Sequence, residues 1–333
     1  RQLSVLRVIR DRGTITRAEI GRVLGLSFSQ VSRLTSSLIE SGWVEVDRRL
    51  ASVDGRPAEL LTLARSTYCV VGLDIGGEFQ QAVTVNLRGE VVATVEARKS
   101  LHGGRASLLE HVEELVTEVL RCAEVSADHV LGLGVGLRAV VDPGRGVITG
   151  GPEAPGWSAE WTEFPVRDEL ARILPWQQII VDDTVRVLGV AEARYGYGRG
   201  ESDFVYLFAD TGIGSAVMIG RHPYVGPAGI AGEIGHVILD PDGDVCGCGR
   251  RGCIETKASS SAILRRASLL LGESAPAMED VIRRADDGDA AMRRLLIEGG
   301  MALGRGIGIM LNLLGPRLIV IGGSAAGSDC YLE

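Results

Sequence analysis

The sequence has 333 residues, of which 45% are apolar, with a mean hydropathy of +0.17 and a formal net charge of −8, and this balance indicates globular packing in two or three domains. Because it holds no run of about 18 uncharged apolar residues and opens on a charged amphipathic segment, we expect no membrane span, no signal peptide and a cytoplasmic protein. Residues 1–65 carry eleven Arg, no Lys and seven acids, whereas the remainder carries 24 basic and 36 acidic residues, so only the first segment is expected to bind a polyanion.

Three helices and a wing are predicted in residues 1–65. Apolar residues recur at helical spacing over residues 2–12, which predicts a first helix. Thr16 and Glu19 have the spacing of a capping box before a short second helix, and Ser27 is the expected N-cap of a third. Two strands around a turn then follow. This order predicts a winged helix-turn-helix, although an ordinary three-helix cap would have the same helical pattern.

The exposed face of the third predicted helix is polar and carries no acid before its end, which suits hydrogen bonding to base edges and phosphates. In the wing, an Arg between Gly55 and Pro57 stands on a rigid turn that fits a minor groove. The residues predicted to contact DNA are Ser27, Ser29, Gln30, Ser32, Arg33 and Arg56.

From residue 68 onward, strands and helices recur in two related halves, which predicts an α/β protein with a cleft. The second half includes one apolar stretch, residues 203–220, that we expect to be a strand. Glycine turns of the kind that cradle phosphate occur at residues 74–77, 211–214 and 322–323. Each turn alone is weak evidence, because glycine also closes ordinary hairpins.

A cysteine-rich loop follows the second half's first strands. Three of the six cysteines, Cys246, Cys248 and Cys253, lie within eight positions, and His236 lies ten residues upstream of the first. Thiolates with an imidazole select zinc, and four protein ligands leave no open position for catalysis. The sequence therefore predicts a structural zinc site, the alternative being buried thiols without a metal.

Nearly the whole chain resembles the ROK family, whose name joins repressors, open reading frames and sugar kinases. The most specific part of the resemblance is Glu233-x-x-His236 together with the cysteine motif that ends in Cys253-x-Glu255. The resemblance implies a two-lobed actin-like ATPase fold behind the winged helix-turn-helix. It places a DNA-binding domain at residues 1–65 and an effector-binding and dimerisation domain at residues 68–333, which we expect to be truncated at its C-terminus. It also assigns zinc to the same four ligands.

A sugar pocket is a further implication of the resemblance. Carboxylates suit such a pocket because each accepts two hydroxyl hydrogen bonds. In the family's kinases the residue that corresponds to Asp183 is the general base. A simple helix-capping role for Asp182 or Asp183 is the alternative. The residues implied to bind sugar are Asp182, Asp183, Glu233, His236 and Glu255.

The chain departs from the kinase pattern at both phosphate turns. Glu78 and Phe79 stand where family kinases tend to carry Thr-Lys, and Asp210 stands where they carry Gly, so carboxylates would repel a nucleotide. The charge of Asp182, in place of the usual Asn, is expected to meet Arg138 or a cationic sugar. The remaining departures on the sugar side are Val185 for Asn and Arg138-Ala139 for Pro-Gly.

These features predict a sugar-responsive DNA-binding transcriptional regulator, a repressor of carbohydrate uptake or catabolism genes, that forms a homodimer or a larger homo-oligomer. We expect no enzyme activity, with Asp183 as a vestigial base position. The alternative is an ATP-dependent sugar kinase that carries a DNA-binding head. A third possibility is a regulator that responds to a protein partner instead of a sugar.

Overall fold

The computed structural model describes residues 1–50, 58–75, 79–98, 104–150, 161–227, 229–272 and 277–333. Contacts divide the chain into two compact units. The first comprises residues 1–99, 108–135 and 169–180, and the second comprises residues 100–107, 136–168 and 181–333. Within the described ranges, no helix combines the length and the apolar content that crossing a membrane requires.

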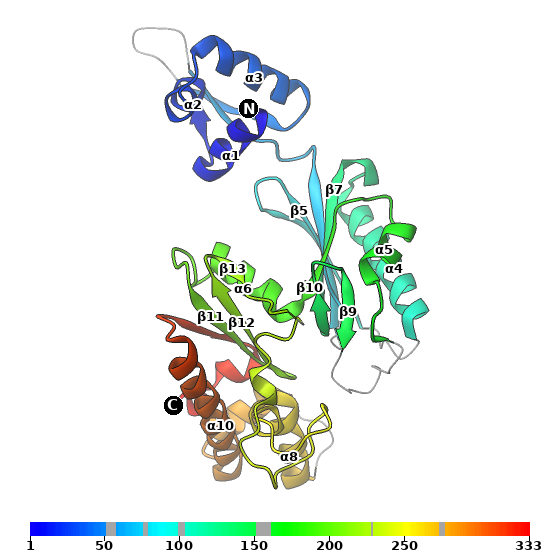
Figure 1. Ribbon diagram of the computed structural model, residues 1–333, viewed down its shortest axis with the longest axis vertical. Helices are drawn as coiled ribbons and strands as arrows, with labels where there is room; N and C mark the ends of the chain where they lie inside the picture. The colour runs from blue at the N-terminus through cyan, green and yellow to red at the C-terminus, as the bar shows by residue number, and fades with distance from the viewer. Residues whose placement is uncertain (51–57, 76–78, 99–103, 151–160, 228, 273–276) are drawn as a thin grey trace. The chain divides into compact units, whose positions relative to one another are not determined.

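The N-terminal part of the first unit has the predicted winged helix-turn-helix elements (Figure 1). Its helices are α1 (Gln2–Arg12), α2 (Arg17–Leu24) and α3 (Phe28–Glu40), and its strands are β1 (Ile15–Thr16), β2 (Val44–Leu50) and β3 (Ala58–Leu63), in the order β1-β3-β2. The predicted capping box of Thr16 and Glu19 is present, and Ser27 caps α3. Val5, Ile9, Ile20, Val31 and Leu61 are fully buried in one core, so the amphipathic pattern of the helices is what packs this region.

A five-stranded sheet follows, in the order β10-β7-β4-β5-β6. Its strands are β4 (Cys69–Ile75), β5 (Phe79–Asn86), β6 (Val91–Arg98), β7 (Val130–Leu137) and β10 (Ile179–Asp183). Strands β4, β5 and β6 pair antiparallel. Helices α4 (Gly104–Ala123) and α5 (Val166–Ile173) lie beside this sheet (Figure 1). A short 3-10 turn, η1 (Ala127–His129), leads into β7, and a separate pair of strands, β8 (Val140–Asp142) and β9 (Val147–Gly150), follows it.

A four-stranded sheet, in the order β13-β12-β11-β14, forms the centre of the second unit. Its strands are β11 (Phe204–Ala209), β12 (Ile213–Ile219), β13 (His222–Pro223) and β14 (Ile319–Gly322). Residues 203–220 are therefore two antiparallel strands and not the single strand expected from their apolar content. The turn between them contains Gly212, and the backbone N–H of Asp210 donates to the Gly212 carbonyl at 3.0 Å.

Helices cover this sheet, and most of the second unit's core lies between them. They are α6 (Thr184–Tyr195), α7 (Glu255–Ala258), α8 (Ser260–Leu271), α9 (Met278–Asp286), α10 (Ala290–Leu314) and α11 (Asp329–Leu332), with 3-10 turns η3 (Ile234–His236) and η4 (Ser324–Gly327). Leu207, Ile263 and Leu296 belong to the core that joins β11 to α8 and α10. Helix α6 packs close to β12, since a Cβ atom at Gly189 would lie 2.7 Å from that of Ala216. The predicted α/β class is confirmed.

Candidate functional site

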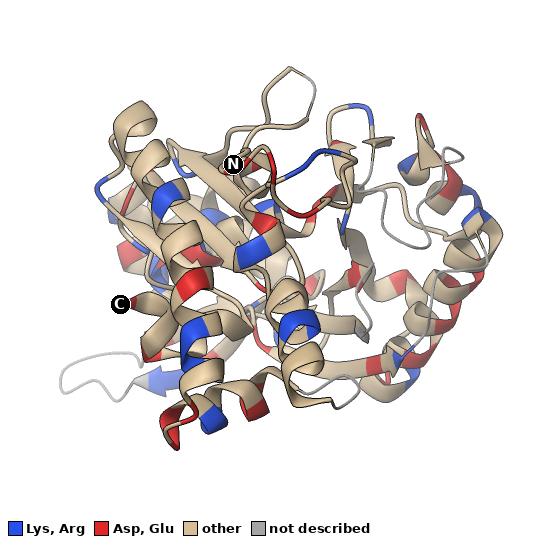
Figure 2. Ribbon diagram, turned by 90° about the horizontal axis from the view of Figure 1, so that it is seen from below, with Lys and Arg blue, Asp and Glu red and all other residues tan. Residues whose placement is uncertain are grey.

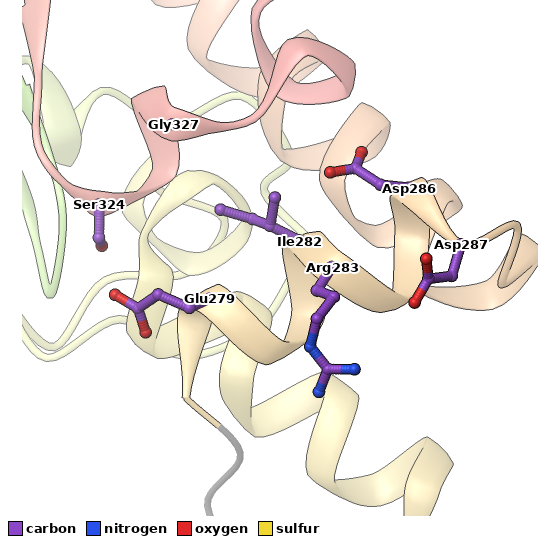
Figure 3. A pocket seen from close by; sticks show the side chains of 7 residues that line it. All are labelled: Glu279, Ile282, Arg283, Asp286, Asp287, Ser324 and Gly327. Carbon is purple, nitrogen blue, oxygen red and sulfur yellow. The ribbon is translucent and has the colours of Figure 1, made fainter.

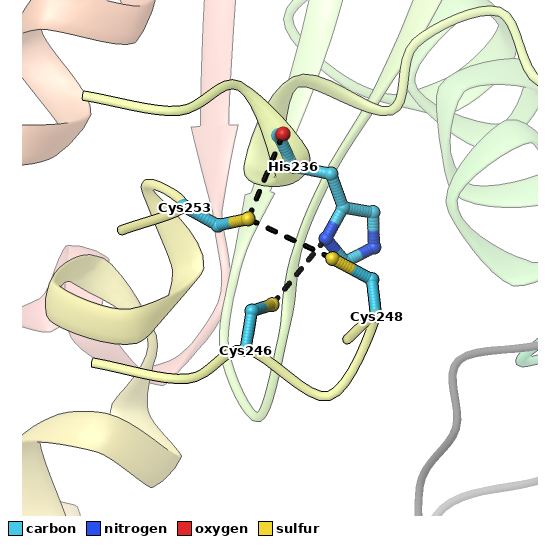
Figure 4. Close-up of side chains that lie close together, drawn as sticks. All are labelled: His236, Cys246, Cys248 and Cys253. Atoms are coloured by element: carbon cyan, nitrogen blue, oxygen red, sulfur yellow. Dashed lines mark hydrogen bonds between the residues drawn. The ribbon is translucent and has the colours of Figure 1, made fainter. Parts of the chain in front are cut away.

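The predicted metal ligands come together as one cluster in the second unit (Figure 4). The donor atoms of His236, Cys246, Cys248 and Cys253 all lie within 4.8 Å of one another. The two sulfurs of Cys248 and Cys253 are 3.7 Å apart, and Nδ1 of His236 is 3.6 Å from the sulfur of Cys246. A tetrahedral zinc ion, with bonds of about 2.3 Å to sulfur and about 2.0–2.1 Å to nitrogen, would hold such pairs roughly 3.5–3.8 Å apart. The four residues therefore fit zinc.

A tightly turned loop sets this spacing. The N–H of Cys246 donates to the carbonyl of Arg250 at 2.7 Å, and the N–H of Gly252 donates to that of Asp244 at 2.9 Å. Gly252 has a φ of +66°, and a Cβ atom there would lie 1.5 Å from the carbonyl oxygen of Asp240. No other residue type fits this position, so the tight turn that brings the three thiols together requires glycine here.

His236 links the metal cluster to the carboxylates. Its Nδ1 faces Cys246, whereas its Nε2 lies 3.8 Å from a carboxylate oxygen of Glu233. Ligation through one ring nitrogen fixes the orientation of the other. On the opposite side, a carboxylate oxygen of Glu255 lies 3.7 Å from the sulfur of Cys246 and the other accepts the N–H of Ile213 at 3.1 Å. A bound metal would thus orient the imidazole beside Glu233, while the backbone N–H of Ile213 holds Glu255.

The carboxylates of Asp183 and Glu255 act electrostatically on Glu233, and all three are predicted sugar residues. Burial raises the pKa of Asp183 to about 6, against the opposing effect of the nearby Arg186. Burial also raises the pKa of Glu233 to about 7, and the charges of Asp183 and Glu255 add to that rise. The structure therefore brings Asp183, Glu233 and Glu255 into one acid cluster, which can offer oxygens to sugar hydroxyls.

The charge of Asp182 is neutralised by an ion pair with Arg186, a residue that the sequence did not single out. One carboxylate oxygen of Asp182 accepts Nε of Arg186 at 2.6 Å and the N–H of Asp183 at 2.8 Å. Arg186 is only 2% exposed, and it also donates to the carbonyls of Val141 at 2.7 Å and Gly229 at 2.9 Å. Of the two partners considered for Asp182, Arg138 and a cationic sugar, the structure shows neither, because Arg186 takes that place. Asp182 lies near the end of β10 and Arg186 lies in the first turn of α6, so the four-residue spacing alone did not indicate the pair.

Asp183 also has the helix-capping role considered as an alternative. Its Oδ1 accepts the N–H groups of Val185 at 2.9 Å and Arg186 at 3.1 Å at the start of α6. Within the described residues no hydrogen bond engages the other oxygen, which can face a ligand or solvent. Capping and ligand binding are therefore compatible in this residue.

Asp183→Asn is expected to stabilise the protein at high pH. The unfolded carboxyl ionises near pH 3.9, whereas the folded one has a pKa of about 6, so folding disfavours the charge and stability falls as pH rises between those values. Asn retains the cap but cannot ionise. We therefore expect its free energy of unfolding to exceed that of the wild type by about 1–3 kcal/mol at pH 8 and by little at pH 4.

Urea unfolding at both pH values checks this expectation. Asp289→Asn is the matched control, because Asp289 caps α10 through Oδ1 in the same way but lies outside the acid cluster. A pH-independent effect of Asp183→Asn, or an equal effect of the control, would contradict the pKa assignment.

In the second glycine turn, which corresponds to a phosphate turn of the kinases, the carboxylate of Asp210 is hydrogen-bonded by hydroxyls of the protein itself. Oδ1 of Asp210 accepts the hydroxyls of Ser260 at 3.1 Å and Ser324 at 2.5 Å. Beside it, a cavity of about 400 Å³ has three carboxylates and a single Arg in its lining (Figure 3). The lining residues are Glu279, Ile282, Arg283, Asp286, Asp287, Ser324 and Gly327. Glu78, the acid predicted at the first turn, lies outside the described residues, and so does the side chain of Phe79.

The predicted DNA-contact residues divide into two groups. Ser27 and Gln30 form a capping box, in which Oε1 of Gln30 accepts the Ser27 N–H at 2.9 Å, so their side chains are partly committed to the helix. Ser29 and Arg33 are exposed on α3 and Ser32 is partly buried. Phe28, which the sequence analysis did not single out, is 66% exposed at the start of the same helix. Arg56 lies outside the described residues.

Charged residues of both signs are spread over the helices (Figure 2).

The winged helix and the body, with its acid and Cys-His clusters, together define a protein of the DNA-binding, sugar-kinase-like class. The ROK family model matches residues 70–333, and the MarR family model matches residues 1–57. The chain belongs to the ROK family. The boundaries expected at residues 1–65 and 68–333 remain predictions.

The chain is similar both to transcriptional repressors and to sugar kinases. A xylose repressor of Caldicellulosiruptor bescii is 26% identical and covers 100% of this chain and 85% of its own length. A glucokinase of Thermotoga maritima is 29% identical, but the match covers 79% of this chain and 84% of the glucokinase. The crystal structure of a ROK family transcriptional regulator, a homologue of the Escherichia coli MLC protein, superposes with a TM-score of 0.77 at 23% identity, over 98% of this chain and 84% of that one.

Proposed function

We propose that this chain is a sugar-responsive regulator that binds operator DNA in the cytoplasm as a homodimer or larger homo-oligomer and represses genes of carbohydrate uptake or catabolism. The observation that carries the proposal is the presence, in one chain, of a winged helix with exposed polar residues on α3 and a body with an acid cluster suited to hydroxyls. Pairing two winged helices on a palindromic site would raise affinity. The similarity to a xylose repressor along the whole chain supports this function.

A structural zinc ion is part of the proposal. The donor set of one imidazole and three thiols, and the spacing of those donors, support zinc over a hard cation. All four positions of a tetrahedron would be filled by protein, so the ion would brace the loop and orient His236 and would not activate water. Glu233, whose carboxylate oxygen lies 3.8 Å from Nε2 of that imidazole, would face the sugar.

The body is proposed to lack kinase activity. The carboxylate of Asp210 takes the place of a glycine and is held by two serine hydroxyls, and the adjacent cavity is acidic. Both features disfavour binding of a nucleotide, because negative carboxylates repel its polyphosphate. The residues carried over from the kinase pattern, Asp183 among them, would then bind sugar without transferring a phosphoryl group.

A sugar kinase with a DNA-binding head is the second candidate. It is favoured by Asp183, whose position and raised pKa suit a general base, and by the similarity to a glucokinase. The two candidates differ in one measurable property: only a kinase would hydrolyse ATP in a sugar-dependent way.

The DNA-binding part of the proposal predicts that Arg33→Ala weakens operator binding. Fragments of genomic DNA retained by the protein would supply the operator. Loss of one phosphate contact should lower affinity about tenfold at moderate salt and reduce the slope of log affinity against log salt concentration by about 1. Fluorescence anisotropy over a range of salt concentrations measures both quantities.

Arg10→Ala is the matched control for this experiment. Arg10 is an exposed Arg in the same basic region, but it lies on α1 and pairs with Asp11 at 2.9 Å. It should bind operator like the wild type. Equal affinities of Arg33→Ala and wild type would show that α3 does not present the reading surface.

A further inference from the structure

Arg138 is a cation at the edge of the acid cluster, and no described residue pairs with it. It follows the last residue of β7, and β7 is the neighbour of β10, which ends at Asp183. Its side chain is partly buried. Within the described part of the chain, no carboxylate lies within ion-pair distance of its guanidinium and no hydrogen bond engages it.

The guanidinium of Arg138 lies next to the second glycine turn. A Cβ atom at Gly212 would lie 3.4 Å from Nη2 of Arg138 and 2.9 Å from Oε2 of Glu255. Gly212 thus leaves room for both side chains to approach the same point. Oε2 of Glu255 already accepts the N–H of Ile213, and it forms no ion pair with Arg138.

The other Arg at the site is fully engaged. Arg186 donates to Asp182 and to two backbone carbonyls, and burial separates it from a ligand. Of the two Arg side chains described at this site, Arg138 is consequently the one that remains for a bound molecule. A partly buried guanidinium gains most from an anion that it can bind through two parallel hydrogen bonds, as phosphate and carboxylate allow.

We propose that the effector is an anionic sugar derivative, and that Arg138 binds its phosphate or carboxylate group at the Gly212 side of the pocket. The hydroxyls of the sugar would then bind at the opposite side, where Asp183 and Glu233 supply acceptor oxygens. This inference rests on the proposed sugar-binding function and specifies the class of ligand. Charge favours this position for the anionic group, because the guanidinium of Arg138 offsets the repulsion from the acids, Glu255 among them.

The test compares neutral and anionic forms of the same sugars on the full chain. Glucose, galactose and mannose are each used as the neutral sugar, the 6-phosphate and the uronate. Isothermal titration calorimetry measures the Kd of each compound for wild type, Arg138→Gln and Arg138→Lys. Operator affinity is measured with the same compounds, and thermal unfolding of each variant checks its fold.

We expect at least one anionic form to bind wild type roughly 10–100-fold more tightly than its neutral parent. Arg138→Gln should abolish that ratio by weakening the anionic form far more than the neutral parent, whereas Arg138→Lys should retain part of it. Since no hydrogen bond or ion pair engages Arg138 within the residues that the structure describes, neither variant should lower the unfolding temperature. A preference for 6-phosphates identifies phosphate as the bound group, and a preference for uronates identifies carboxylate.

Two results would overturn the assignment while leaving the proposed regulator intact. One is a neutral hexose that binds as tightly as both of its anionic forms and alters operator affinity. The other is an anionic preference that survives Arg138→Gln. Failure of every compound to bind or to alter operator affinity would instead contradict the sugar-responsive function, and this inference with it.

Discussion

Replacing Arg186 by Met is expected to lower the free energy of unfolding by about 3–5 kcal/mol. The substitution keeps much of the side-chain volume but leaves the carboxylate of Asp182 and the carbonyls of Val141 and Gly229 without their donor. A buried charge that loses its partner has a large desolvation cost that no nearby group offsets. Chemical denaturation at pH 7 measures the loss.

Arg167→Met is the matched control, because Arg167 also donates to two backbone carbonyls, those of Gly144 and Arg145, but in an exposed setting. It should cost less than about 1 kcal/mol. The double variant Asp182→Asn/Arg186→Met should recover part of the stability, since it removes the unpaired charge. A small effect of Arg186→Met, or no recovery in the double variant, would contradict the role assigned to the pair.

Cys248→Ser is expected to remove the metal and to destabilise the second unit severely. Wild-type protein should contain one zinc ion per chain, and the variant close to none. Because binding free energy at a structural site adds to folding free energy, we expect a loss on the order of 5 kcal/mol or more and strong sensitivity of the wild type to chelators. Elemental analysis and denaturation with and without a chelator measure both effects.

Cys122→Ser is the control for this prediction, since Cys122 is exposed on α4 and does not belong to the cluster. It should retain the metal and the stability of the wild type. Full metal content in Cys248→Ser, or a wild-type protein without zinc, would show that the four residues are only buried thiols and an imidazole.

Features that depend on neighbouring residues in the chain were predictable from the sequence. The capping box of Thr16 and Glu19 needs only the right residue types three positions apart, and it is present. The cysteine loop is similar, because Cys246, Cys248 and Cys253 are brought together by a few tight turns. His236 could be included in the predicted cluster because it lies only ten residues before Cys246 in the sequence. The structure confirms that these four residues lie together.

Features that depend on distant segments were not predictable in the same way. Arg186 meets Val141 and Gly229, each more than forty residues away in the chain, so no local pattern indicates that its guanidinium is buried. The serine hydroxyls that hold Asp210 come from α8 and from the turn after β14. The sequence indicated that an acid had entered the phosphate turn, but only the fold identifies what satisfies that acid.

The measurement that tests the account most directly is operator affinity with and without sugars, made alongside ATP turnover on the same protein. We predict that at least one sugar or sugar derivative changes operator affinity by about 5–150-fold, the range of ordinary coupling between two sites, and that none stimulates ATP hydrolysis. Release of DNA is the expected direction for a repressor. Sugar-dependent ATP hydrolysis, with an operator affinity that no sugar alters, would contradict the account and identify a kinase.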